Sequence, residues 1–492
     1  MAKVLFAHGH LLRFDPKLFE IGKPYPPLAT LFAAAYVRSH GHAVALFDPM
    51  LDRDTSGIAT ALGREAPDVV VLYDDSFNWF TKMCLSRMRE AALAIVEQAH
   101  ARGVTVIVAG HDAADHPERF LDRGASFVIR GEGEITLNEL LNALSDAKGD
   151  LSRAKDRATA IAGLIFRHKG MVRRTVARKL LQDLDVLPLP AWDLVDIERY
   201  RAFWKRRHGY FSLNVVTTRG CPYLCNWCSK PVYGNTYHSR SPASVVAELT
   251  MLRDAYRPDH IWFCDDILGL KSSWLLAFAR EVQDAKVKTR FLCQTRADLM
   301  TPQNVQALAD AGAHEVWLGV ESGAQRILDA MQKGITVEQT RMAVTHLRSH
   351  RVRVGFFVQF GYGDENWNDV SATRSLLREL LPDDVGISVS YPLPGTRYFE
   401  QNAHKMGEKD HWSDSRDLDP LVPATFPRKV YPTLSRMVHA EIRTWRGARA
   451  LRAILKAPTT ISAVSLKEVA EMRKAASWLF HRLRLEAQLR RN

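Results

Sequence analysis

Short runs of apolar residues alternate with helical patterns along the first 148 residues of the chain. The apolar runs are almost uninterrupted, which is typical of parallel strands covered on both faces. The segments between them repeat apolar residues at the spacing of amphipathic helices. Five runs predict strands, at residues 3–9, 42–48, 68–73, 104–110 and 126–131.

Five strands alternating with helices predict a doubly wound α/β domain over residues 1–148, Rossmann-like and of the flavodoxin type. Ligands of such domains bind outside the carboxyl ends of the strands. Four loops are expected to form that binding edge, at residues 8–14, 74–80, 110–115 and 131–134.

Residues 149–208 interrupt this alternation. The run 163–174 predicts a small hairpin that turns at Lys169-Gly170, and the proline-containing run 184–196 has little periodicity. We interpret residues 149–208 as a connector that wraps one domain onto the next.

A second strand–helix series predicts a partial (β/α)6 barrel of the TIM type over residues 209–405. Its six apolar runs lie at 212–218, 260–266, 289–295, 315–322, 354–361 and 385–393. Barrel chemistry takes place at the carboxyl ends of strands. The residues expected there are Cys221, Asp265, Asp266, Arg296, Glu321, Gly361 and Pro392.

The last part of the chain, residues 406–492, reads as a basic helical region. Residues 421–492 carry 15 Lys and Arg against 4 Asp and Glu, whereas the whole chain has a net charge of +12. Because residues 1–420 are close to neutral, the main body gives no sign of a nucleic-acid channel.

Three of the six cysteines, Cys221, Cys225 and Cys228, fall within eight residues in a loop after the first barrel strand. Thiolates with this C-x3-C-x2-C spacing can hold one face of a 4Fe–4S cluster and leave its fourth iron open. A structural zinc site needs a fourth ligand, and His238 keeps that alternative open. Cys84, Cys264 and Cys293 are predicted to be core residues.

Clustered free cysteines favour a reducing compartment. The chain runs at once into a predicted strand without the features of a signal peptide, and no apolar stretch is long enough to span a bilayer. We therefore expect a cytoplasmic protein.

The run from Arg219 to Cys228, with an aromatic residue before its last cysteine, resembles the signature of the radical S-adenosylmethionine superfamily. The resemblance implies that the cysteines hold a 4Fe–4S cluster whose open iron is chelated by S-adenosylmethionine. It also implies that an electron from the cluster cleaves the C–S bond to give a 5′-deoxyadenosyl radical. Trp227 would then lie beside the adenine.

Other strand ends resemble the same family in their order along the barrel. The resemblance implies S-adenosylmethionine contacts at Asp265 and Asp266, at Glu321 and Ser322, and at Gly361. A carboxylate suits ribose because it accepts hydrogen bonds from two adjacent hydroxyls. The structural alternatives are a helix cap for Asp266 and an ordinary turn for Gly361.

The absence of cysteines after Cys293, and of more than one before the cluster, argues against two branches of the superfamily. No cysteine follows Cys293, which argues against a C-terminal auxiliary-cluster domain, and only Cys84 precedes the three clustered ones. The second fact argues against the tRNA methylthiotransferase branch.

A Rossmann-like domain before the barrel resembles the cobalamin-binding class, and this resemblance covers nearly the whole chain. No G-x-G-x-x-G follows the first strand, so a dinucleotide fits poorly. No Asp-x-His-x-x-Gly is present either, so cobalamin would lack a histidine on its lower face, and His8 and His10 are interpreted as ordinary loop residues. The alternative is a domain that binds nothing, or only the substrate. The implied cobalamin edge consists of Gly110, His111, Gly131, Glu132 and Gly133.

Residues 411–418 and the basic helix after them are similar to the anaerobic magnesium-protoporphyrin IX monomethyl ester cyclase branch. The basic tail suits contact with a membrane surface, which would fit a lipid or tetrapyrrole substrate. The alternative is a solvated helix face that caps the barrel.

The first hypothesis is a cobalamin-dependent radical enzyme that abstracts hydrogen from an unactivated carbon, followed by methyl transfer from methylcobalamin or by oxidative cyclisation. Its expected partners are a small, hydrophobic substrate (a tetrapyrrole, lipid or natural product) and a reductant such as flavodoxin or ferredoxin. The second hypothesis is a radical enzyme that modifies RNA. The third is a non-catalytic, zinc-stapled protein that binds a ligand.

Overall fold

The protein is described here by a computed structural model. It describes residues 1–77, 86–230, 232–406, 418–456, 466, 469–470 and 477–490, so Cys84 and nearly all of 411–418 lie outside the described residues. The chain forms two compact units. The first comprises Met1–Pro222, Lys230–Cys293 and Asp310–Gly312, and the second comprises Tyr223–Ser229, Gln294–Ala309 and Ala313–Asn492.

A seven-stranded sheet with the order β2-β1-β3-β4-β5-β6-β7 forms the core of the N-terminal part of the first unit. Its first five strands pair in parallel, in the order 2-1-3-4-5 that defines the flavodoxin type. The predicted fold is therefore confirmed. These strands are β1 (Lys3–Ala7), β2 (Ala43–Phe47), β3 (Val69–Tyr73), β4 (Thr105–Ala109) and β5 (Phe127–Ile129).

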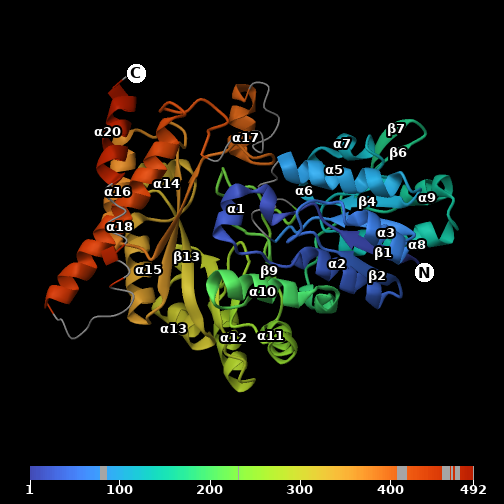
Figure 1. Ribbon diagram of the computed structural model, residues 1–492, viewed down its shortest axis with the longest axis horizontal. Coiled ribbons are helices and arrows are strands. Elements are labelled where there is room, and N and C mark those ends of the chain that lie inside the picture. The colour runs from blue at the N-terminus through green and yellow to red at the C-terminus, as the bar shows by residue number, and fades with distance from the viewer. Residues whose placement is uncertain are drawn as a thin grey trace. The chain divides into compact units, whose positions relative to one another are not determined.

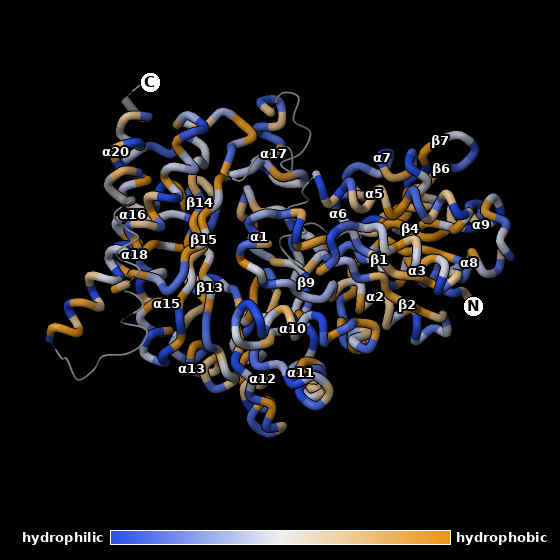
Figure 2. The backbone as a smooth tube through the Cα atoms, in the orientation of Figure 1, coloured by the Kyte–Doolittle hydropathy of each residue, from blue (hydrophilic) through white to orange (hydrophobic). Residues whose placement is uncertain are grey.

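Helices cover both faces of this sheet, and the strands between them are strongly hydrophobic (Figures 1 and 2). On one face α2 packs beside α8, and on the other α3 packs beside α5. The buried core includes Leu5, Val70 and Val108, which are fully shielded from solvent. The helices are α1 (Pro16–Ile21), α2 (Leu28–Ser39), α3 (Ile58–Glu65), α5 (Ser86–His100), α6 (His111–Asp115), α7 (Pro117–Leu121) and α8 (Glu134–Asp146).

The predicted hairpin at Lys169-Gly170 forms, and it joins the first sheet. After α9 (Leu151–Ala158), β6 (Leu164–His168) pairs antiparallel with both β5 and β7 (Met171–Arg174). The sequence pattern predicts the turn but not this edge pairing, because a five-residue strand does not specify its neighbour.

The first unit also contains the start of the second strand–helix series. Helix α10 (Ile197–His208) precedes three parallel neighbours, β8 (Ser212–Val215), β11 (His260–Phe263) and β12 (Arg290–Thr295), whose last two residues belong to the second unit. Between these strands lie α11 (Pro242–Tyr256) and α12 (Ser272–Asp284).

The second unit continues the series with β13 (Ala313–Glu321), β14 (Arg353–Phe360) and β15 (Asp384–Val389), again paired in parallel. The sheet order is β15-β14-β13-β12-β11-β8, so all six predicted strands of the half-barrel form. Its helices are α13 (Pro302–Ala311), α14 (Gln325–Ala330), α15 (Val337–Ser349), α16 (Trp367–Leu380) and α17 (Arg397–Asn402).

The C-terminal part is helical, as predicted. Helix α18 (Val430–Lys456) packs against α20 (Ser477–Arg490), and α18 also contacts α16. Among the described residues, no helix is both long and apolar enough to cross a membrane.

Candidate functional site

A narrow hairpin closes the base of the cysteine loop. Strand β9 (Thr218–Arg219) pairs antiparallel with β10 (His238–Ser239), on either side of residues 220–237. Gly220 has a φ of +79°, and a β-carbon there would overlap the carbonyl oxygen of Thr236. The chain therefore needs glycine directly before Cys221.

The three clustered cysteines differ from the other described cysteines in exposure. Cys221, Cys225 and Cys228 form no disulfide and are partly exposed, whereas Cys264 and Cys293 are buried, as predicted for core residues. Burial raises the pKa of the Cys293 thiol. Three accessible thiols on one loop are a donor set that suits an iron–sulfur cluster. Among the described residues, no three His, Cys, Asp or Glu side chains form a group suited to one metal ion.

Asn226, which the sequence analysis did not single out, fixes the middle of the cysteine loop within the second unit. Its backbone N–H donates to the Met331 carbonyl at 3.1 Å, and its side-chain amide donates to the Ala330 carbonyl at 2.8 Å. The hydroxyl of Tyr362 donates to Asn226 Oδ1 at 2.8 Å. Asn226 lies between Cys225 and Trp227, so these bonds position both neighbours.

A cation–π contact fixes the start of the same segment. The Arg296 guanidinium lies 3.5 Å from the ring centre of Tyr223. Arg296 also donates to the Lys333 carbonyl at 2.8 Å and pairs with Asp298 at 3.0 Å. Arg296, predicted at a strand end, therefore supports the cysteine loop.

Glu321 forms a buried ion pair with Lys333, whose Nζ lies 2.8 Å from Glu321 Oε1. Glu321 has a φ of +59° at a register shift of β13. Burial works to lower the pKa of Lys333, but the Glu321 carboxylate and the Cys225 thiol raise it more. Gly319 leaves room for the pair, because a β-carbon there would lie 2.7 Å from Lys333 Nζ.

Trp227 is half-buried against a small apolar cluster that includes Ala324, Ile327 and Tyr362. Its indole N–H is buried and has no hydrogen-bond partner among the described residues. An unpaired buried donor is costly, so this position favours a ligand with an acceptor. The adenine contact at Trp227 stays a prediction.

Ser322 and Gly361 form hydrogen bonds that stabilise the backbone around them. The fully buried Ser322 hydroxyl contacts the Thr373 hydroxyl at 3.1 Å and accepts from Ala324 N–H at 3.1 Å. Gly361 has a φ of +77°, and its N–H donates to Glu365 at 2.6 Å. Burial raises the pKa of Glu365 to about 8. Contacts of Ser322 and Gly361 with S-adenosylmethionine remain predictions.

Asp265 links the ends of β8 and β11 within the first unit. Its Oδ1 accepts from the N–H groups of Thr217 and Thr218 at 2.7 and 2.6 Å. Burial raises the pKa of Asp265 to about 6, against the lowering effect of these bonds. The helix-cap alternative for Asp266 is wrong, because Lys271 is the N-cap residue of α12.

The predicted cobalamin edge and the residue before Gly220 meet through a buried ion-pair network in the first unit. Arg219 donates to Glu132 at 3.0 Å and to Glu134 at 2.6 Å, and all three side chains are 3–4% exposed. Glu132 also accepts from the Leu181 N–H at 2.5 Å. Because the glutamates follow β5, these bonds join the predicted cobalamin edge to the base of the cysteine loop.

Aromatic rings surround the same guanidinium. The carbon centre of the Arg219 guanidinium lies 5.2 Å from the ring centre of Tyr233, 5.5 Å from Phe77 and 5.9 Å from Phe32. Tyr233 stacks on Phe77 at 5.5 Å, and its hydroxyl lies 2.8 Å from that of Ser76. The loop after β3 therefore also contacts the cysteine loop.

The glycines of the cobalamin edge allow close backbone approach. A β-carbon at Gly110 would lie 2.8 Å from Asp74 Oδ2, and one at Gly133 would overlap the ring of Tyr73. Gly131 has a φ of +84°, and a β-carbon there would meet nothing within 4 Å. His111 is buried at the start of α6. Cobalamin contacts at these residues stay a prediction.

The two histidines after β1 are buried. His8 Nε2 lies 3.0 Å from Asp48 Oδ1, and Tyr200 donates to Asp48 Oδ2 at 2.7 Å. Burial, aided by His8, lowers the pKa of His10 to about 3, which keeps that ring neutral. These contacts agree with the interpretation of both residues as structural.

Two protein-family models match the chain, and they lie along it in the order that the sequence predicts. The B12 binding domain matches residues 18–141, and the Radical SAM superfamily matches residues 215–377.

Relatives match along most of the chain. An uncharacterised methyltransferase of Pyrococcus horikoshii is 28% identical over 82% of this chain and 84% of its own length. The anaerobic magnesium-protoporphyrin IX monomethyl ester cyclase of Rubrivivax gelatinosus is 23% identical over 82% of this chain and 70% of its own.

Solved structures show the same fold. The cobalamin-dependent S-adenosylmethionine radical enzyme OxsB, with aqua-cobalamin and S-adenosylmethionine bound, superposes with a TM-score of 0.70. It is 17% identical, over 98% of this chain and 72% of that one. The methyltransferase TsrM from Kitasatospora setae gives 0.64 at 19% identity, over 82% and 75%. This chain belongs to the cobalamin-binding class of the radical S-adenosylmethionine superfamily.

Proposed function

We propose that this enzyme transfers a methyl group to an unactivated carbon of a small molecule. The observation that carries the proposal is the Arg219 network, which joins the two loops expected to face the two cofactors. Relatives named methyltransferases, such as the one from Pyrococcus horikoshii and the hopanoid C-3 methylase of Methylococcus capsulatus, support methyl transfer.

The chain's own residues hold and orient the reactants. Cys221, Cys225 and Cys228 hold the cluster, which supplies the electron that cleaves S-adenosylmethionine, while cobalamin supplies the methyl group. Asn226 sets the direction of the loop between its cysteines through its bonds to Ala330 and Met331.

Charged groups close to the loop suit an amino acid ligand. Lys333 and Arg296 already pair with Glu321 and Asp298 in the second unit, so a ligand carboxylate would accept from the N–H groups that these pairs leave open. The Glu321 carboxylate can accept from ribose hydroxyls through the oxygen that Lys333 does not hold. Trp227 offers an apolar ring and a buried N–H to the adenine.

On the first unit, the edge at Gly110, His111 and 131–133 holds cobalamin. The open space at Gly131 leaves room for a flat macrocycle, whereas Gly110 lets the side chain of Asp74 approach the backbone. Since His8 is bound to Asp48 and His10 is buried, the lower face takes no histidine from this loop.

The substrate class follows from the relatives. Their names include tetrapyrrole and lipid modification, so we infer a small apolar substrate. The radical chemistry needs an electron donor, for which we propose a flavodoxin or ferredoxin, and the clustered cysteines favour action in the cytoplasm. The basic tail supports peripheral contact with an anionic membrane as a further part of this proposal.

Oxidative ring closure is the second candidate. The match to the magnesium-protoporphyrin cyclase of Rubrivivax gelatinosus along 82% of this chain favours it. The comparisons favour both radical reactions over RNA modification and over a zinc-stapled binding protein.

The test is 5′-deoxyadenosine release by anaerobically reconstituted protein with S-adenosylmethionine, cobalamin and a strong reductant. The parent should release it, and a Cys221→Ala/Cys225→Ala/Cys228→Ala variant should not. A product heavier by one methylene supports methyl transfer, whereas loss of hydrogen supports ring closure. Zinc in place of iron, with no release, would contradict the proposal.

A further inference from the structure

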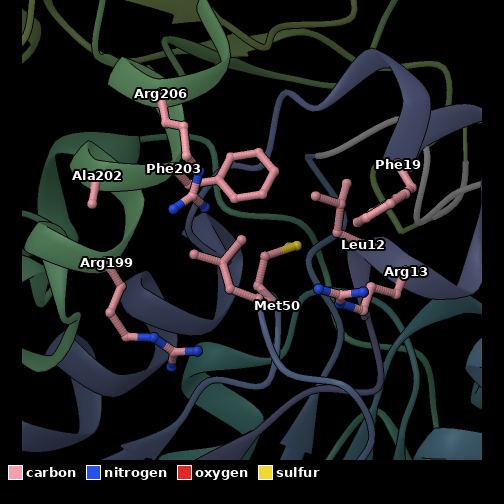
Figure 3. A pocket seen from close by; sticks show the side chains of 9 residues that line it. Leu12, Arg13, Phe19, Met50, Arg199, Ala202, Phe203 and Arg206 are labelled. Atoms are coloured by element: carbon pink, nitrogen blue, oxygen red, sulfur yellow. The ribbon is translucent and has the colours of Figure 1, made fainter.

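The first unit contains a pocket of about 270 Å³ where the loops after β1 and β2 face helix α10 (Figure 3). Its walls combine apolar and basic side chains, which is a common composition of small-molecule sites. The apolar residues are Leu12, Phe19, Met50, Leu51, Ala202 and Phe203, and the basic residues are Arg13, Arg199 and Arg206.

The three arginines differ in their partners. Arg199 donates to Asp52 at 2.7 Å. Arg13 lies over the ring of Phe19 at 5.0 Å, and Arg206 lies over that of Phe203 at 5.8 Å. Among the described residues, neither Arg13 nor Arg206 has an ion pair, so the pocket carries positive charge that no carboxylate balances.

Nearby acids are engaged elsewhere. Asp15 caps α1 by accepting from the N–H groups of Lys17 and Leu18. Asp48 accepts from Tyr200 and from the Met50 N–H at 3.0 Å. Neither acid lines the pocket, so the arginines are the charged groups that a ligand would meet.

The pocket's place in the fold also points to a ligand. Leu12 N–H donates to the Met50 carbonyl at 3.0 Å, which ties together the loops after β1 and β2. These loops leave the carboxyl ends of two neighbouring strands of a doubly wound sheet. Ligands of such sheets bind at this edge.

We propose that this pocket binds an anionic amphiphile, a molecule or molecular arm with an apolar body and a phosphate or carboxylate. Figure 3 shows Phe19 and Arg13 on one wall and Phe203 and Arg206 on the facing wall. The apolar body contacts the two rings, and the acid accepts hydrogen bonds from the two guanidinium groups.

This inference goes beyond the proposed function and does not depend on radical chemistry. Two sources share the required chemistry: an acidic organic substrate, and the phosphate-bearing tail of cobalamin. Binding to the full-length protein without added cofactors tests the pocket alone, so its failure is distinct from a failure of S-adenosylmethionine cleavage.

The probes are decyl phosphate and decanol, titrated calorimetrically into the full-length protein. Decyl phosphate should bind more tightly than decanol by about tenfold, the loss that follows when a charge-assisted contact is missing. An Arg13→Gln/Arg206→Gln variant should bind both probes equally weakly. An Ala202→Trp variant, which fills the pocket from the exposed side of α10, should bind neither.

An Arg102→Gln/Arg173→Gln variant removes two exposed charges elsewhere and should bind like the parent. Circular dichroism establishes that each variant is folded. Equal binding of decyl phosphate to the parent and both pocket variants would overturn the proposal, as would equal binding of decanol and decyl phosphate to the parent. Competition by hydroxocobalamin assigns the pocket to the cobalamin tail, and simultaneous binding assigns it to the substrate.

Discussion

The guanidinium of Arg219 lies 2.6 Å from the carboxylate of Glu134, and both side chains are buried. Arg219 stands two residues before Cys221, whereas Glu134 begins α8 of the N-terminal sheet domain. The residues are 85 positions apart. Within the first unit, the contact therefore fixes the chain directly before Cys221 to the edge where cobalamin is proposed to bind.

Replacing Arg219 by methionine should destabilise the protein by about 3–5 kcal/mol, because two buried carboxylates lose their cation. Chemical denaturation measures the loss. Cobalamin uptake, followed by absorbance, should fall as well, since the loop of Glu132 and Glu134 loses its support.

The exposed pair of Arg38 and Asp193 is the control. Its side chains are 42% and 59% exposed, so Arg38→Met should cost less than about 1 kcal/mol. A triple variant, Arg219→Met/Glu132→Gln/Glu134→Gln, should regain part of the stability. An Arg219→Met variant as stable as the parent would refute the role of the network.

Sequence periodicity predicted the strands because each has a nearly unbroken apolar run, as in β3 and β4. It also placed Cys221, Glu321 and Gly361 at strand ends. Sequence periodicity does not predict which distant segments contact one another. No sequence pattern marks Lys333 as the partner of Glu321, because the pair forms only when the chain folds back through α14. Nor does any mark Asn226, whose bond to Ala330 forms only when the cysteine loop packs on α14.

The same limit explains the pocket and the edge strands. The arginines of the pocket come from loops and a helix nearly 200 residues apart in the chain, so no sequence window contains them. Strand β6 pairs with β5 in a sheet that the preceding strands already define. The periodicity of a strand does not specify which strand it joins at such an edge.

Gly220→Ala should reduce the iron content of the reconstituted protein. A β-carbon at this φ of +79° would overlap the Thr236 carbonyl, so the chain must shift directly before Cys221. Iron and sulfide analysis measures the effect. Gly234→Ala is the matched control in the same loop: it has a φ of +61° but meets nothing within 4 Å. Equal iron in both variants would contradict the prediction.

Gly319→Ala should weaken binding of S-adenosylmethionine by about tenfold, the cost of losing one charge-assisted hydrogen bond. The new methyl group would lie 2.7 Å from Lys333 Nζ and displace the pair with Glu321. Equilibrium binding of S-adenosylmethionine to the cluster-loaded protein measures this affinity. The iron content of the variant should equal that of the parent. Gly63→Ala, at an open position of α3, should bind like the parent. Normal affinity of Gly319→Ala for S-adenosylmethionine would show that the Glu321–Lys333 ion pair does not contribute to binding.

Glu365 should make the protein less stable as the pH rises towards 8. Its pKa is raised from 4.5 to about 8 by burial, so between these values the folded state holds a proton that the unfolded state releases. The free energy of unfolding should then fall by at most about 1.4 kcal/mol per pH unit. Asp74 and Asp265, whose pKa values burial raises to about 7 and about 6, act in the same direction.

Comparison with a variant isolates the contribution of Glu365. Denaturant unfolding of the parent and of Glu365→Gln at pH 5, 6, 7 and 8 spans the window set by its raised pKa. The glutamine keeps an oxygen for the Gly361 N–H but cannot ionise, so this variant should lose less stability than the parent as the pH rises. Glu338→Gln, on the exposed side of α15, should keep the parent's slope. Parallel pH profiles for the parent and Glu365→Gln would show that the buried carboxyl is ionised throughout, and would contradict the raised pKa of Glu365.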